Sequence, residues 1–252
     1  MIETALERQA HAHLDLASRE HKARKIEQLL DLRPSGKTLR VLEVGTGSGG
    51  IAHYFATRSA VKCDVMAVDV LDNRVVRDGY EYRQVDGVEL PFDAASFDVV
   101  ISNHVVEHVG AAEAQRCHVA ELHRVLRPDG VAYLAVPNRW MLVEPHYRLA
   151  FLSWLPDAWR TPYLRWSGLG AEYDCRPLTG RQARRLLEQA GFDAQQQTGR
   201  AVRQAYQLER PQSWAYLLLW SWLPDAVYWS LGPVFPTLIY VLRKSDRRYD
   251  SR

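Results

Sequence analysis

The sequence is poor in the features that mark several classes of protein. It has three cysteines (Cys63, Cys117 and Cys175) and no C-x-x-C pair. Neither a disulfide framework nor a zinc site is therefore predicted, and a reducing, cytoplasmic setting is favoured. Residues 1–25 lack the apolar core of a signal peptide. No run of about 18 uncharged apolar residues passes without a proline or a charge, which argues against a simple membrane span.

An excess of charge of one sign is also absent. The chain has 32 Lys and Arg against 30 Asp and Glu, so no nucleic-acid partner is predicted, although a local basic patch stays open. Apolar residues make up 47% and charged residues 25% of the 252 positions, which is globular usage. Tryptophan is missing from the first 139 residues, and all eight tryptophans follow. The two parts of the chain therefore differ in surface character.

Hydrophobic patterning predicts alternating strands and helices. A helix is expected over residues 5–31, where it would cap a cofactor cleft or lie solvated. Further helices are expected at 49–58, 113–126 and 179–190, and strands at 40–44, 63–70, 80–86, 97–103, 131–136, 192–198 and 237–242. This rhythm indicates an α/β fold with a parallel sheet covered by helices on both faces.

The same pattern divides the chain into six parts. They are an N-terminal helix (1–36), a Rossmann-like cofactor-binding core (37–138), a first cap insertion (139–178), a core helix and strand (179–202), an aromatic second cap insertion (203–235), and a last strand with a charged tail (236–252).

A glycine cluster follows the first expected strand, in VLEVGTGSGG over residues 41–50. Glycines let a backbone turn tightly and approach a ligand, and the following helix offers unpaired N–H groups. Gly45-x-Gly47-x-x-Gly50 satisfies the dinucleotide pattern, and Asp69 lies where a ribose-binding acid belongs. A cofactor containing a nucleotide is predicted. Glu43 beside the loop disfavours a pyrophosphate and suits a cationic amino group.

Further motifs narrow the prediction. Asp86-Gly87 ends the third strand, Ser96–Val100 opens the fourth, and Leu126-Arg127-Pro128-Asp129-Gly130 precedes the fifth. With these motifs in order, residues 38–138 resemble the class I S-adenosylmethionine-dependent methyltransferases, in the branch of quinone-biosynthesis and small-molecule enzymes. The resemblance implies a seven-stranded sheet with an antiparallel last strand and S-adenosyl-L-methionine, which becomes S-adenosyl-L-homocysteine, across the carboxyl ends of the strands.

The resemblance also implies roles for individual residues. It places the methionine part of the cofactor against the glycine loop, at Glu43, Gly45, Thr46 and Gly47. The ribose hydroxyls lie on Asp69 at the end of the second strand, with Val70 beside the adenine. Asp86 and Gly87 after the third strand contact the adenine edge, and Asn103 at the end of the fourth lies near the sulfonium. A strand-end cap for Asp69 and a turn for Asp86 are the structural alternatives.

Candidate bases are histidines. His104 and His108 follow the fourth strand, where a helical turn would put both on one face, and His146 begins the first insertion. Histidine accepts a proton near neutral pH, so each is a candidate catalytic residue. The alternatives are that His108 orders its loop and that His104 is structural. No metal site is predicted, because the spacing of the three histidines is irregular.

The aromatic insertions point to the acceptor. In the second, Asp225 is the only charge between Pro211 and Leu242, and the hexapeptide Ser153–Ala158 of the first recurs as Ser221–Ala226. Three interpretations stay open: an aromatic lid over a small substrate, a membrane-surface contact of 139–178 and 203–235 that presents the site to lipid, and a homodimer interface.

The expected function is methyl transfer to an oxygen of a hydrophobic, lipid-linked or glycolipid acceptor. Asn103-His104-Val105-Val106 lacks the Asn-Pro-Pro-aromatic signature of amino-group methylators. A soluble-metabolite methyltransferase with an aromatic lid and a non-catalytic scaffold that binds the cofactor are the alternatives. A nucleic-acid methyltransferase is a weaker one.

Overall fold

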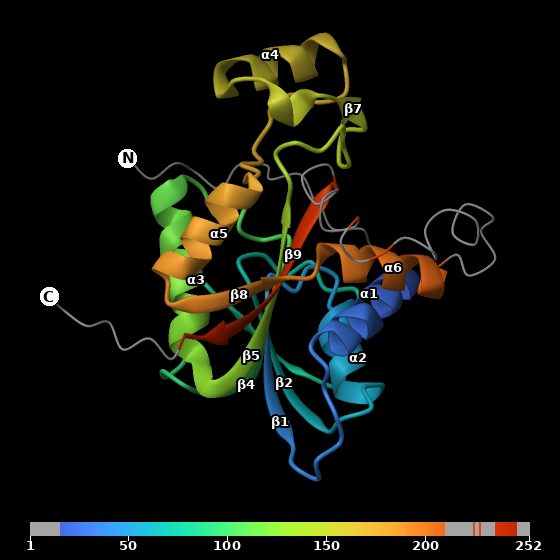
Figure 1. Ribbon diagram of the computed structural model, residues 1–252, viewed down its shortest axis with the longest axis vertical. Helices are drawn as coiled ribbons and strands as arrows, with labels where there is room; N and C mark the ends of the chain where they lie inside the picture. The colour runs from blue at the N-terminus through green and yellow to red at the C-terminus, as the bar shows by residue number, and fades with distance from the viewer. Residues whose placement is uncertain (1–15, 210–223, 225–226, 228–234, 246–252) are drawn as a thin grey trace, which may run out of the picture.

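A computed structural model describes residues 16–209, 224, 227 and 235–245 (Figure 1). Seven strands form one sheet in the order β3-β2-β1-β4-β5-β9-β8. Pairs among the first five are parallel, and β9 is antiparallel to both neighbours. The predicted fold class is confirmed. The strands are β1 (Leu39–Val44), β2 (Cys63–Asp69), β3 (Glu81–Gln84), β4 (Phe97–Asn103), β5 (Leu126–Pro137), β8 (Phe192–Gln196) and β9 (Thr237–Lys244).

Helices cover both faces of this sheet. In Figure 1, α3 (Ala112–Val125) and α5 (Gly180–Gln189) lie on one side, and α1 (Leu16–Leu29), α2 (Gly50–Thr57) and α6 (Thr198–Glu209) lie on the other. Each side has its own apolar core, and the strands supply both. Leu42 and Val100 face the α3 side, whereas Val41 and Val99 face the α1 side. This alternation explains why the central strands read as nearly continuous apolar runs.

The first insertion forms a small subdomain. It comprises the hairpin β6 (Val143–Glu144) and β7 (Leu149–Ala150), the 3-10 turn η1 (Leu152–Trp154) and α4 (Asp157–Trp166). Tyr147, Leu152 and Leu164 form its core. We call residues 139–178 the cap, because they stand above the carboxyl ends of the parallel strands in Figure 1. In the first copy of the repeat, α4 begins at Asp157, directly after Leu155-Pro156; of the second copy, only Pro224 is described.

Several predicted boundaries are wrong. β5 begins at Leu126, which pairs with Phe97. The pairing then shifts at a bulge, and Val131 pairs with Val99. Residues 127–130, which precede the strand expected at 131–136, therefore lie inside β5. α6 continues to Glu209, so no irregular stretch begins at 203. The three cysteines differ in burial: Cys175 is buried, Cys63 is partly exposed and Cys117 is exposed. Residues 5–15 of the first helix, most of 210–234 and the tail lie outside the described residues.

No helix in the described part of the chain has the length and apolar character needed to cross a membrane.

Candidate functional site

The loop between β1 and α2 requires glycine. Gly45, Gly47 and Gly49 have φ angles of 77°, 53° and 81°, in the left-handed region that residues with a Cβ rarely adopt. A Cβ at Gly45 would also lie 2.3 Å from Val105 Cγ2, so the loop runs directly against the segment that follows β4. The loop ends where α2 begins, and α2 therefore presents its N-terminus at this edge.

Asp69 closes the other side of this loop. Its Oδ2 accepts a hydrogen bond from Gly47 N–H at 2.8 Å, and its Oδ1 accepts one from Val70 N–H at 2.8 Å. The side chain is partly exposed. Because each carboxylate oxygen can accept more than one hydrogen bond, Asp69 retains the capacity to bind the hydroxyls of a ligand.

Asp86 and Gly87 lie farther along the same edge. Asp69 and Gln84 are register partners on β2 and β3, and Asp86 follows two residues later. Asp86 and Gly87 are both exposed, and Gly87 has a φ of 85°. Gln84 Nε2 donates to the Val70 carbonyl at 2.9 Å. Gln84, which the sequence analysis missed, thus ties the two strand ends together.

Glu43 is buried, with 2% of its surface exposed, and it braces the loop from below. Its Oε2 accepts hydrogen bonds from Thr46 Oγ1 at 2.6 Å and Ala52 N–H at 2.9 Å. Burial raises the pKa of Glu43 to about 7, although Arg19 on α1 favours the charged form. α1 packs against α2, and Arg19 also lies against Gly50. Glu43 thus holds the loop in shape, and its contact with a cofactor stays a prediction.

We expect Glu43→Gln to flatten the pH dependence of stability. Between pH 4.5 and 7 the folded state keeps a proton that the unfolded chain loses, so rising pH favours unfolding until the folded pKa is passed. Urea unfolding between pH 5 and 8 should show the wild type losing about 2–3 kcal/mol relative to the variant. Glu81→Gln, at an exposed carboxyl of β3, is the control. Parallel curves for wild type and Glu43→Gln would contradict the prediction.

The loop after β4 is a bend and a turn, and the predicted helical turn is absent from it. Asn103 is buried at the strand end, His104 has a φ of 61°, and His108 N–H bonds the Val105 carbonyl. The two histidines meet the same buried carboxylate. His104 Nδ1 lies 3.1 Å and His108 Nε2 lies 4.0 Å from Glu107 Oε1.

His146 comes from the cap and meets His108. Their ring centroids are 6.1 Å apart in an edge-to-face arrangement. His146 Nδ1 lies 2.7 Å from Oε1 of the buried Glu144, and this hydrogen bond raises the pKa of His146. The structure therefore brings two of the three predicted histidines together over the carboxyl end of the sheet, with His104 beside Glu107.

Sequence reasoning missed Cys175 and Asp174 at this place. Cys175 Sγ lies 3.8 Å from both ring nitrogens of His108. No local motif could have found them, because the contact joins positions 67 residues apart. Two hollows of about 380 and 440 Å³ lie elsewhere, one around Thr38 and Lys62 and the other between α1 and α6, and neither includes a predicted site residue.

Comparisons with known proteins agree with this geometry. Residues 42–134 match the family described as "Methyltransferase domain". The malonyl-[acyl-carrier protein] O-methyltransferase of Enterobacter lignolyticus is 32% identical over 117 residues, covering 44% of each chain. The phthiotriol/phenolphthiotriol dimycocerosates methyltransferase of Mycobacterium leprae is 35% identical over 108 residues, which cover 38% of this chain and 36% of the relative.

Residues 42–134 thus carry a methyltransferase domain, and this part of the chain is similar to S-adenosylmethionine-dependent methyltransferases.

Solved structures share the fold of this methyltransferase domain. The 1,6-didemethyltoxoflavin-N1-methyltransferase of Burkholderia thailandensis, with bound S-adenosylhomocysteine, has a TM-score of 0.52 at 19% identity, covering 92% of this chain and 80% of its own. The [4+2]-cyclase SpnF scores 0.54 at 18% identity, covering 90% and 80%. The fold thus also serves a cyclase, and the fold alone does not establish methyl transfer. The chain spans about half the length, or less, of the curated relatives it matches first.

The residues at the loop fit the cofactor of this family. The close approach of Gly45 to Val105 leaves no room for a side chain, and Asp69 has acceptor capacity beside a helix N-terminus. These groups match a ligand that brings ribose hydroxyls to a carboxylate and lies against bare backbone.

Proposed function

We propose that this chain transfers a methyl group from S-adenosylmethionine to an oxygen of a hydrophobic or lipid-linked acceptor. The observation that carries the proposal is the meeting of His146 with His108 above the carboxyl ends of the strands. One histidine comes from the core and the other from the cap. An acceptor lying between core and cap would reach a proton acceptor and the methyl donor together.

The cofactor would lie along the carboxyl edge of β1 to β4. Asp69 would bind the ribose hydroxyls, with Val70, Asp86 and Gly87 about the adenine. Gly45, Thr46 and Gly47 would line the methionine part, where Glu43 supports the loop, and Asn103 would lie near the sulfonium. The bound sulfonium supplies an activated methyl group, so the protein aligns the acceptor and removes its proton.

His146 is the histidine best arranged as the base. Hydrogen bonding of Nδ1 to Glu144 leaves Nε2 as the acceptor nitrogen of the ring, and the carboxylate stabilises the imidazolium that forms. Glu144 is fixed in turn by Tyr147 N–H at 2.8 Å. His108 would contact the acceptor, and His104 would hold Glu107 in place.

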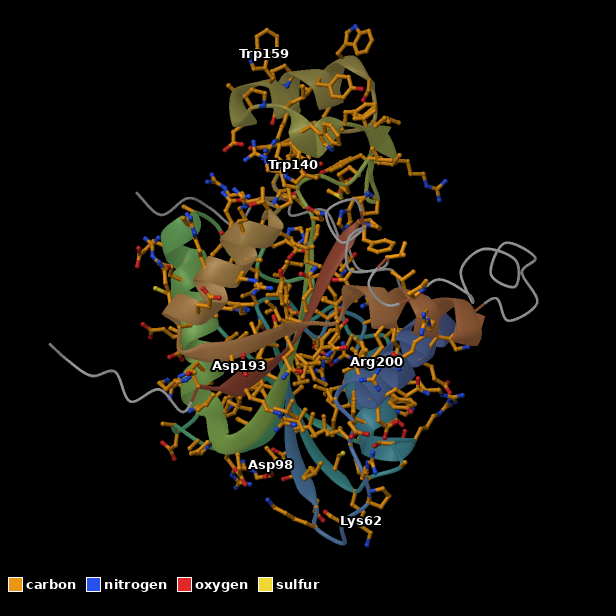
Figure 2. All side chains as sticks on the ribbon, in the orientation of Figure 1. Lys62, Asp98, Trp140, Trp159, Asp193 and Arg200 are labelled. Carbon is orange, nitrogen blue, oxygen red and sulfur yellow. The ribbon has the colours of Figure 1, made fainter. Side chains whose placement is uncertain are left out.

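The cap favours an apolar acceptor. Eight of the eleven exposed large apolar side chains of the described residues lie in it. Trp159 and Trp166 are 67% and 83% exposed, and Trp159 lies at the far end of the cap in Figure 2. One relative is named for a lipid substrate class, the dimycocerosates. Arg148 and Arg165 are exposed, whereas Arg160 is buried on the Ser153 and Leu155 carbonyls and does not face an anionic lipid.

Transfer of label tests the proposed function. Purified protein is incubated with S-adenosylmethionine carrying a tritiated methyl group and either a total lipid extract or a polar metabolite extract of cells. Label in the organic phase of the lipid reaction supports the proposal. Label in the polar extract alone supports a soluble-metabolite methyltransferase. Tight cofactor binding without transfer to either extract supports the non-catalytic scaffold.

Vesicle flotation tests the membrane contact of the cap. We expect Trp159→Ala and Trp166→Ala each to weaken co-flotation with phosphatidylglycerol vesicles by about tenfold, because each removes an aromatic side chain that enters the interface. Val75→Ala, at a 52% exposed apolar residue outside the cap, should leave flotation unchanged. Absence of flotation by the wild type would rule out this contact.

A further inference from the structure

Three side chains of metal-ligating types converge beside the loop that follows β4. A ligand atom from each of His108, Asp174 and Cys175 lies within 4.8 Å of the other two. We propose that these residues form a binding site for a divalent metal ion of the zinc class, with a remaining position that faces the acceptor. The irregular histidine spacing predicted no such site, because two of the ligands come from the end of the cap.

The spacing of His108 and Cys175 fits tetrahedral coordination. Zinc binds thiolate sulfur at about 2.3 Å and imidazole nitrogen at about 2.0–2.1 Å, which puts two such ligand atoms about 3.6 Å apart in a tetrahedron. Cys175 Sγ lies 3.8 Å from both Nδ1 and Nε2 of His108. Three protein ligands with an open fourth position are the arrangement of catalytic rather than structural zinc sites.

Backbone contacts hold the ligands at this separation. Arg176 N–H donates to the Glu107 carbonyl at 2.9 Å. The side chain of Gln115 on α3 donates to the carbonyls of Val106 and Arg176, each at 3.2 Å. The segments carrying His108 and Cys175 are thus fastened to each other directly beside the pair, so that a metal would find these two ligands already in place.

The charge around the site favours a cation. Glu107 and Glu144 are each only 1% exposed, and Asp174 adds a third carboxylate at the site. Glu107 Oε2 is buried and has no hydrogen-bond partner among the described residues. A buried carboxylate oxygen without a partner is costly. A divalent cation beside His108 would offset that negative charge and stabilise the thiolate that binds it.

A second trio shares the cysteine: Glu144, His146 and Cys175 also lie within 4.8 Å. The Nδ1 of His146, however, already lies 2.7 Å from Glu144 Oε1. Assigning the metal to the first trio keeps this hydrogen bond intact and leaves His146 as the proton acceptor beside the site.

A metal at this site would activate the acceptor hydroxyl for methyl transfer. This role rests on the proposed function. An acceptor hydroxyl on the metal loses its proton more easily. That proton passes to His146, the oxygen forms its bond to the methyl carbon as the S–CH3 bond breaks, and neutral S-adenosylhomocysteine leaves. The products are the methyl ether or ester, S-adenosylhomocysteine and one proton.

Cobalt titration tests the site without any acceptor. Full-length protein freed of metal with a chelator is titrated with Co²⁺ alone. We expect one equivalent to bind with a thiolate-to-cobalt charge-transfer absorption, which Cys175→Ala removes. His108→Ala and Asp174→Asn should each weaken Co²⁺ and Zn²⁺ binding by at least about 100-fold, as expected for loss of a ligand rather than of a surrounding group. Cys117→Ala and Cys63→Ala are the controls.

Three results would overturn the proposal: no charge-transfer absorption in the wild type, its persistence in Cys175→Ala, or its loss in His146→Ala but not in His108→Ala. Circular dichroism of each variant excludes unfolding as the cause. Calorimetry with S-adenosylmethionine is run on the same metal-free samples. Cofactor binding without cobalt binding would defeat the metal site alone, and cobalt binding without cofactor binding would defeat the proposed function alone.

Discussion

Replacing Asp69 by alanine is expected to lower the affinity for S-adenosylmethionine by at least about 100-fold. Two ribose hydroxyls bonded to a carboxylate contribute about 1.5–3 kcal/mol each. The substitution also removes the acceptor that holds Gly47 N–H at 2.8 Å, so the loop loses its shape as well as its ligand contact. Isothermal titration calorimetry with S-adenosylmethionine and with S-adenosylhomocysteine measures both effects together.

Two further variants separate these effects. Asp69→Asn keeps one carbonyl acceptor for the loop and should bind with intermediate affinity. Asp64→Ala changes an exposed acid near the opposite end of the same strand and should bind the cofactor as the wild type does. Cooperative urea unfolding of each variant shows that the fold is retained. A folded Asp69→Ala protein with unchanged affinity would place the cofactor elsewhere.

The sheet could be predicted from the sequence because its signals are local. All seven residues of β4 are buried, and a strand covered on both faces reads as a continuous apolar run. Gly45 and Gly47 lie in a short motif whose geometry follows from the turn itself, and Asp69 ends the next strand. α6 escaped prediction because it is held by its partners: Ala201 is buried, and Arg200 Nη2 bonds the Gln28 carbonyl of α1.

The acceptor side of the site was only partly predictable. His104 and His108 could be named from their residue type and their place after β4, and His146 from its place at the start of the first insertion. Their division of roles depends on Glu107, Glu144 and Cys175, which reach them through the folding of the cap back onto the core. The spacing of histidines along the chain carries no information about a cysteine 67 residues away. That part of the chemistry became visible only in three dimensions.

Replacing His146 by alanine is expected to lower the rate of methyl transfer by about 100- to 10,000-fold, the range for loss of a general base. Cofactor affinity should not change, because His146 lies on the cap and not at the glycine loop. Glu144→Gln should lower the rate less, because it keeps a hydrogen bond to Nδ1 but no longer stabilises the imidazolium. Single-turnover transfer from tritiated S-adenosylmethionine to the lipid extract measures the rates.

His123→Ala is the matched control, since this histidine lies in the last turn of α3 and packs against Phe192 and Gly191, none of them a predicted site residue. It should transfer methyl groups at the wild-type rate once its unfolding curve shows a folded protein. If His146→Ala keeps full activity while His108→Ala loses it, His146 is not the base, and the acceptor is activated at the loop after β4. If both variants keep full activity, the acceptor loses its proton to solvent, and the histidine pair above the sheet has no part in the chemistry.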